Sequence, residues 1–139
     1  MGTIAFLIIY FGSLLTGSLY SLTFHKKELY YSAVGASGAV SGIVFSCIML
    51  YPQMQLGLIL IPIPIPGYIF GVAYLLYSIY GMKNRLGNIG HSAHLGGAIG
   101  GYTLTLLLYP QVFQENFLMI SIISIPIIFL LIAGKKLDV

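Results

Sequence analysis

The sequence has very little charge. Only 6% of its 139 residues are Asp, Glu, Lys or Arg, whereas 58% are hydrophobic. Soluble globular domains carry about 25% charged residues, so the composition excludes an ordinary soluble domain and predicts an integral membrane protein. The net charge of +3 comes from basic residues in short clusters between apolar runs. Because they form no basic stripe with interleaved aromatic residues, the pattern argues against nucleic acid as a partner.

Cysteine and acidic residues are almost absent. The one cysteine, Cys47, lies inside an apolar run and can form no internal disulfide, so we interpret it as a small core residue. The 3 acidic residues all lie outside the apolar runs, which excludes an aspartyl protease with paired carboxylates in its spans. A His-Glu-x-x-His motif is also missing from the sequence. We therefore predict neither a metal site nor a cofactor.

Five apolar runs dominate the chain. A helix needs about 20 predominantly apolar residues to cross a bilayer, and these runs have that length or come close to it. We predict an all-α fold, a polytopic transmembrane helix bundle that forms one domain over residues 1–139, in a multi-pass protein of the cell membrane. No basic segment precedes the first run, so we expect no cleaved signal peptide. The expected spans are 3–24, 34–51, 67–81, 93–109 and 117–133.

Prolines mark two weak points in this pattern. Pro62, Pro64 and Pro66 alternate before the third span, and each removes a backbone donor and disfavours helix in the residue before it. We predict an extended approach to that span, with Pro66 near its first helical position. Pro126 lies inside the fifth span and is expected to interrupt it. The stretch 110–116, between the last two spans, is predicted to be a loop.

Small residues recur four positions apart on the second and fourth spans. Gly38 and Gly42 form this pattern on the second span, and Gly97 and Gly101 form it on the fourth, with Gly96 alongside. In lipid such faces let helix backbones approach closely, because packing and polar contacts replace the hydrophobic effect between helices. We predict that these glycines support close packing of the two spans. A compact bundle with no further role is the alternative explanation.

A hydroxyl and an imidazole stand near the start of these same two spans. Ser37 lies in Gly35-Ala36-Ser37-Gly38, and His94 lies in His91-Ser92-Ala93-His94-Leu95-Gly96-Gly97. If all five spans cross, both spans begin at one membrane face, so close packing brings the two side chains together at similar depth. They are the minimum parts for nucleophilic catalysis in a bilayer. Taken singly, each has a plainer explanation, a hydroxyl bonded to its own helix or a satisfied polar residue of the bundle.

The chemistry of this pair follows from its surroundings. Since no span carries a carboxylate that could orient His94, a Ser-His dyad is expected rather than a triad. Near a helix start, Ser37 has backbone N–H groups without internal partners beside it. Gly35 and Gly38 keep side chains away from a carbonyl bound there. These features amount to half of an oxyanion hole.

At these residues the chain resembles the rhomboid intramembrane proteases. Gly35–Gly38 is similar to the nucleophile motif of that family, and Ala93–Gly97 is similar to its histidine helix. The resemblance implies that Ser37 attacks the scissile carbonyl of a transmembrane protein substrate, while His94 takes and returns the proton. It also implies that the third span acts as a gate over the site. Four residues after the nucleophile the family often has an aromatic residue that stacks on the histidine, and here Ser41 stands at that position.

The family has a six-helix core, and the chain resembles only part of it. The first four spans resemble the last four of the core, so the chain is expected to be a truncated rhomboid, without the first two helices and the His and Asn that complete the oxyanion hole. Two alternative functions stay open. One is a non-catalytic rhomboid-like protein that binds transmembrane clients, and the other is a small transporter or channel component.

The orientation of the chain in the membrane is predicted differently by two arguments. The positive-inside rule places the face bearing Ser37 and His94 in the cytoplasm, whereas the family orientation places it on the other side.

Overall fold

Helices make up nearly all of the described chain. The computed structural model describes residues 2–24, 37–51, 55–56, 64–84 and 91–133. Within these residues the all-α prediction is confirmed, and the only strands are one antiparallel pair of two residues each. In chain order the elements are α1 (Thr3–Phe24), α2 (Ser37–Leu50), β1 (Gln55–Leu56), β2 (Ile65–Pro66), α3 (Gly67–Asn84), α4 (His91–Leu108), α5 (Gln111–Glu115) and α6 (Phe117–Ala133).

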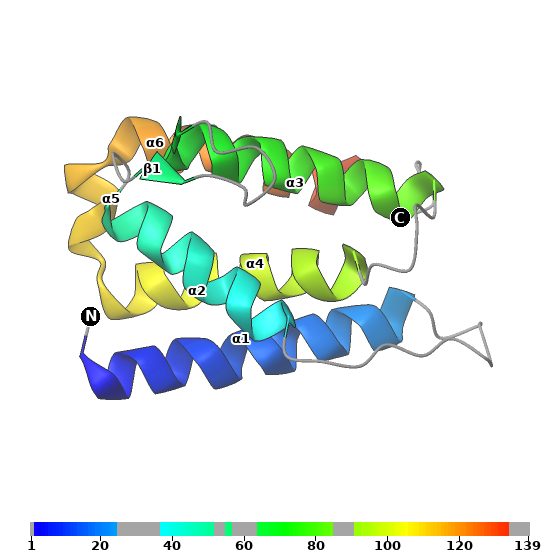
Figure 1. Ribbon diagram of the computed structural model, residues 1–139, viewed down its shortest axis with the longest axis horizontal. Helices are drawn as coiled ribbons and strands as arrows, with labels where there is room; N and C mark the ends of the chain where they lie inside the picture. Colours follow the sequence, from blue (N-terminus) through cyan, green and yellow to red (C-terminus); the bar gives the residue numbers. More distant parts are fainter. Residues whose placement is uncertain (1, 25–36, 52–54, 57–63, 85–90, 134–139) are drawn as a thin grey trace.

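The five longer helices alternate in direction and form three layers (Figure 1). α1 lies along one side, α3 and α6 lie along the opposite side, and α2 and α4 lie between them. Because α2 and α4 run the same way, both begin at one end of the bundle. The starts of these two helices are the parts of the chain that carry the predicted site.

Large apolar side chains cover the outside of α1 and α6. Ile4 on α1 is 75% exposed and Ile132 on α6 is 77% exposed. By length and composition, one helix in the described part of the chain can cross a membrane, over Thr3–Leu22. Exposed apolar surface on this scale is unfavourable in water and suits a hydrocarbon surrounding. Shorter apolar helices cover Gly38–Leu50, Gly67–Gly81 and Phe117–Ile132.

The contact among α1, α2 and α4 is made by backbone rather than by large side chains. A Cβ on Gly97 would fall on the carbonyl group of Gly38, and a Cβ on Gly101 would fall on the carbonyl oxygen of Gly42. A Cβ on Gly17 would lie 2.6 Å from the carbonyl oxygen of Ala93. Only glycine permits this approach. We refer to the residues that make it as the glycine interface: Gly17 of α1, Gly38 and Gly42 of α2, and Gly97 and Gly101 of α4.

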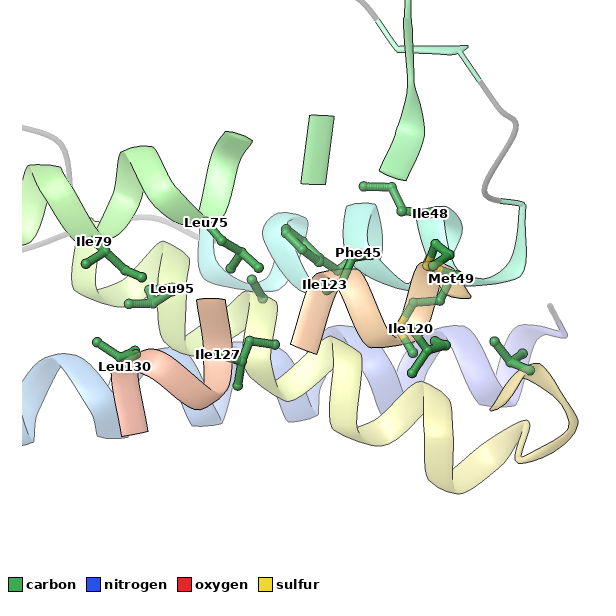
Figure 2. Packing of buried hydrophobic residues seen from close by; sticks show 13 residues of the cluster. Phe45, Ile48, Met49, Leu75, Ile79, Leu95, Ile120, Ile123, Ile127 and Leu130 are labelled. Atoms are coloured by element: carbon green, nitrogen blue, oxygen red, sulfur yellow. The ribbon is translucent and has the colours of Figure 1, made fainter. Parts of the chain in front are cut away.

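The other half of the bundle is packed through large side chains. Figure 2 shows side chains from α2, α3, α4 and α6 pointing toward one another in a single cluster. Interiors of this kind depend on interlocking shapes, since each pair of atoms contributes little by itself. We call this cluster the side-chain core; its largest buried members include Phe45, Ile48 and Met49 of α2, Leu75 and Ile79 of α3, Leu95 of α4, and Ile120, Ile123, Ile127 and Leu130 of α6.

Two local expectations are wrong. The stretch 110–116 contains a short helix, α5, because Pro110 adopts helical angles and can precede a helix, where its missing N–H costs nothing. Pro126 does not interrupt α6, which runs unbroken from Phe117 to Ala133. In membrane helices a proline is tolerated because neighbouring groups and small backbone adjustments compensate for the lost hydrogen bond.

The ends of the helices are tied by polar groups. The Asn116 amide donates a 3.3 Å hydrogen bond to the carbonyl oxygen of Met49, in the last turn of α2, where carbonyls have no partner within the helix. An extended segment was predicted before α3, and the structure describes its two ends, at residues 55–56 and 64–66. Leu56 pairs with Ile65 and Gln55 pairs with Pro66, so the described ends form β1 and β2. Residues 57–63 lie outside the described part of the chain.

Candidate active site

The predicted nucleophile stands at the start of α2. Ser37 is the first helical residue described there, and Gly38 follows it, buried in the glycine interface. Gly35, predicted to support the oxyanion, lies outside the described residues. The predicted general base stands at the start of α4. His94 is the fourth residue of that helix, so each residue lies within the first turn of its helix.

The residues next to Ser37 and His94 are in backbone contact. A Cβ built on Gly38 would lie 3.0 Å from the carbonyl oxygen of Ala93 and 3.7 Å from its carbonyl carbon. One turn further along α4, a Cβ on Gly97 would lie 2.8 Å from the Gly38 Cα. Ser37 directly precedes Gly38 and His94 directly follows Ala93, so this contact holds Ser37 and His94 at neighbouring positions on the two helices. The starts of α2 and α4 are therefore adjacent.

The other glycines predicted to assist packing near the site lie where α1, α2 and α4 contact one another. Gly42 faces Ser13 of α1, and a Cβ there would lie 2.9 Å from the carbonyl oxygen of Gly97. A Cβ on Gly96 would lie 2.6 Å from the Tyr20 Cβ, so this residue lets α4 approach α1. Gly101 lies against Gly42, one turn beyond Gly97, as described above. The predicted packing residues thus serve three helix contacts, those of α1 with α2, α2 with α4 and α1 with α4.

A serine pair fixes α4 to α1 beside the histidine. The buried Ser92 hydroxyl donates a 3.1 Å hydrogen bond to the Ser21 Oγ of α1. In lipid such interhelical hydrogen bonds average about 0.6 kcal/mol, and this one joins segments that are 71 residues apart in sequence. It holds the first turn of α4, two residues before His94, against a second helix.

One aromatic ring of α3, that of Tyr74, lies against the imidazole of His94. The rings of Tyr74 and His94 are stacked, with centroids 6.2 Å apart and planes inclined by 26°. The Tyr74 hydroxyl is 2.8 Å from the Ser41 Oγ of α2, within hydrogen-bond distance. Phe70 stacks on Tyr74 at 6.1 Å, and Phe45 packs against it at 5.8 Å. His94 itself is half-buried in this surrounding.

Tyr74 is the residue that analysis of the sequence missed. It is one of 11 tyrosines, and its position in the third apolar run has no motif. Only an indirect signal in the sequence pointed to an aromatic residue from another helix. Where the family often has an aromatic residue, this chain has Ser41, so a histidine stacked on a ring would require the ring to come from another helix. The structure has such a ring in Tyr74.

The described part of the chain holds few acidic residues. Glu115, in α5, is the only acidic residue in the described part of the chain, and it follows the far end of α4 from His94. The described residues contain no group of three His, Cys, Asp or Glu side chains that could hold a metal ion. A described contact of the imidazole is with the ring of Tyr74.

Comparison with known proteins identifies a family. The Rhomboid domain matches residues 1–111. The chain is also 30% identical over 104 residues to a protein named "Rhomboid protein 1, mitochondrial" from Saccharomyces cerevisiae. That match covers 73% of this chain and 30% of the yeast protein, so the chain spans about a third of the length of this relative. No solved structure matches the chain significantly.

Proposed function

Because the chain belongs to the rhomboid family and is thus a multi-pass membrane protein, we propose that it acts as an intramembrane serine endopeptidase. Its substrates are transmembrane proteins, and Ser37 and His94 form the catalytic dyad. The observation that carries the proposal is the backbone contact between Gly38 and Ala93. This contact makes the starts of α2 and α4 neighbours, at the end of the bundle where both helices begin.

The proposed reaction proceeds in two halves. In the first, the Ser37 Oγ attacks the carbonyl carbon of the scissile peptide, and a His94 ring nitrogen takes the hydroxyl proton and passes it to the leaving amine. The C–N bond breaks and an acyl ester on Ser37 remains. In the second half, His94 takes a proton from water as the water oxygen attacks the ester carbonyl carbon. The bond between that carbon and the Ser37 Oγ then breaks, the carboxylic acid product leaves, and His94 returns the proton to Ser37. Neither half requires a cofactor or a metal.

Stabilisation of the oxyanion is assigned to the first turn of α2. Backbone N–H groups at a helix start carry partial positive charge and lack partners within the helix. Gly38 has no Cβ to shield these groups, and Gly35 is proposed to act in the same way before the helix. Each such donor typically contributes about 10²–10³-fold in rate when it is aimed at the developing negative charge.

The dyad is tested by comparing probe labelling and substrate cleavage between variants of Ser37 and His94 and a control variant of another serine in α2. The protein is expressed from its complete gene in membranes, and labelling by a fluorophosphonate probe and cleavage of a single-span reporter are measured. Ser37→Ala and His94→Ala are expected to reduce cleavage by at least roughly 10³-fold, as removal of a nucleophile or base does in serine hydrolases. Ser46→Ala is the control, since Ser46 is a buried serine of the same helix and is not proposed to react.

Two results would overturn the proposal. Cleavage that persists in Ser37→Ala would exclude this serine as the nucleophile. A wild-type protein that binds the reporter helix but neither cleaves it nor reacts with the probe would favour the alternative, a non-catalytic rhomboid-like protein that binds transmembrane clients.

Orientation is tested separately. α3 ends at the same end of the bundle at which α2 and α4 begin (Figure 1), so a cysteine at position 83, near the end of α3, reports the side of the membrane on which the site opens. The natural Cys47 is first replaced by alanine to remove background. Labelling of Lys83→Cys only from the cytoplasm would support the positive-inside rule, and labelling only from the opposite side would support the family orientation. Residence in the cell membrane also stays a prediction.

A further inference from the structure

Tyr74 joins three helices at the proposed site. It belongs to α3, its ring is stacked on His94 of α4, and its hydroxyl is in hydrogen-bond distance of Ser41 of α2. The ring is also held from two further directions, by Phe70 and by the fully buried Phe45. A side chain fixed at its hydroxyl end and along its ring has little freedom of its own. It can therefore restrict the freedom of the imidazole stacked on it.

A general base needs this kind of restriction. In a Ser-His-Asp triad the acid holds the imidazole in a productive orientation, but the described residues place no carboxylate beside His94. Reaction rates are sensitive to such placement, since an error of 1 Å can cost about 10²-fold. A stacked aromatic ring limits rotation of the imidazole and leaves both of its nitrogens available in the ring plane.

We propose that Tyr74 is the positioning residue for His94, and that Ser41 fixes Tyr74 in the orientation this requires. The inference rests on the proposed Ser37–His94 dyad. In this role Tyr74 acts through the histidine and not on the scissile bond itself. Its position on α3 makes productive placement of His94 depend on α3 being packed against α2 and α4.

The test measures how fast Ser37 reacts with the fluorophosphonate probe, separating the maximal inactivation rate from the probe affinity. Tyr74→Leu removes the ring and is expected to lower the maximal rate about 10–100-fold, with affinity changed less than about twofold. Tyr74→Phe keeps the ring and is expected to restore most of the rate. Tyr68→Leu is the matched control, because Tyr68 lies on the same helix against the same core. Its maximal rate is expected to equal that of the wild type.

The hydroxyl contact is tested by a double-mutant cycle that does not depend on removing the ring. Ser41→Ala and Tyr74→Phe each remove one side of the same hydrogen bond, so the double variant is expected to react no more slowly than either single variant. Fully additive losses would overturn the role of Ser41. Equal rates for Tyr74→Leu and Tyr68→Leu, in variants of equal thermal stability, would overturn the role of Tyr74.

Failure of the underlying function would look different. In that case the wild-type protein would not react with the probe at Ser37, whatever residue stands at position 74. A wild-type protein that reacts, with Ser37→Ala inert and Tyr74→Leu unaffected, would keep the dyad and reject only the positioning role.

Discussion

The two halves of this bundle solve the same packing problem by opposite means. At the glycine interface, α1, α2 and α4 meet backbone to backbone, with no side chain between Gly97 and the Gly38 carbonyl. In the side-chain core, α3 and α6 meet α2 and α4 through large residues such as Phe45, Leu75 and Ile123. The first contact is made mainly by backbone atoms, with Ser13 as a side chain against Gly42, whereas the second consists of side chains that can change rotamer.

This difference matches the division of roles proposed for the helices. Helices in lipid gain little from the hydrophobic effect between them, so close approach and local packing decide their relative positions. The rigid contact lies between the helices that carry Ser37 and His94, where small displacements are costly. The adjustable contact holds α3, the helix that carries Tyr74.

The largest effect is expected from adding one carbon to the glycine interface. In Gly97→Ala the new Cβ would overlap the Gly38 carbonyl, and a backbone group cannot move aside as a flexible side chain can. We expect a loss of about 3 kcal/mol in the free energy of unfolding, at the upper end of typical overpacking costs. Probe labelling at Ser37 should fall with it. The measurement is equilibrium unfolding in mixed detergent micelles, and a near-neutral result would show that the interface can yield.

Truncation in the side-chain core should cost less. Leu75→Ala removes a fully buried side chain of α3. In soluble proteins such changes cost about 2–5 kcal/mol, but part of that is transfer from water, which does not apply between helices in lipid. We therefore expect about 2 kcal/mol by the same unfolding measurement. A loss exceeding that of Gly97→Ala would reverse the proposed ranking of the two contacts.

A glycine that lies in the side-chain core should tolerate a methyl group. A Cβ on Gly71 of α3 would lie 3.5 Å from Ile48 Cδ1 and 3.5 Å from Phe45 Cε1, at ordinary contact distance. Because alanine is the better helix former, Gly71→Ala is expected to stabilise the protein by about 0.5–1 kcal/mol. This variant is the matched control for Gly97→Ala, and destabilisation would indicate that α3 packs more tightly than described.

The smallest effect concerns one hydrogen bond between α4 and α6. The Tyr102 and Ser124 hydroxyls are hydrogen-bonded to each other, and the Ser124 hydroxyl also donates to the Ile120 carbonyl oxygen of its own helix. Tyr102→Phe keeps the ring and removes the link, so we expect a loss near the membrane average of about 0.6 kcal/mol. Thermal unfolding of the purified protein would detect it. A loss as large as that of Leu75→Ala would mean that α6 is held chiefly by this bond.

Much of the fold could be predicted because its signals are local. The five apolar runs mark the long helices, although α3 extends to Asn84 and α4 starts at His91, beyond the expected ends. The recurrence of glycine every four residues at Gly38, Gly42, Gly97 and Gly101 is a pattern that follows directly from helix geometry. Helix α5 and the unbroken course of α6 through Pro126 were not predicted. A proline can either precede a helix, as Pro110 does, or lie inside one, as Pro126 does, and the residue alone does not distinguish these cases from a break.

The site was less accessible to prediction because its parts come from different helices. Ser37 and His94 stand in recognisable motifs, so they could be proposed from the sequence, and they stay proposals. Tyr74 has no motif, and its importance arises only from where α3 packs. Pairwise contacts between distant spans depend on helix rotation, which a short apolar run such as α3, with large residues on several faces, does not specify.

The serine bond between α1 and α4 also has a consequence for how the protein is made. Ser21 and Ser92 are 71 residues apart, so a ribosome working at about 5–20 residues per second needs roughly 4–14 s to synthesise the second after the first. During that interval the Ser21–Ser92 bond cannot form, and the starts of α2 and α4 cannot meet. The proposed Ser37–His94 pair is consequently incomplete until α4 has been synthesised and packed against α2.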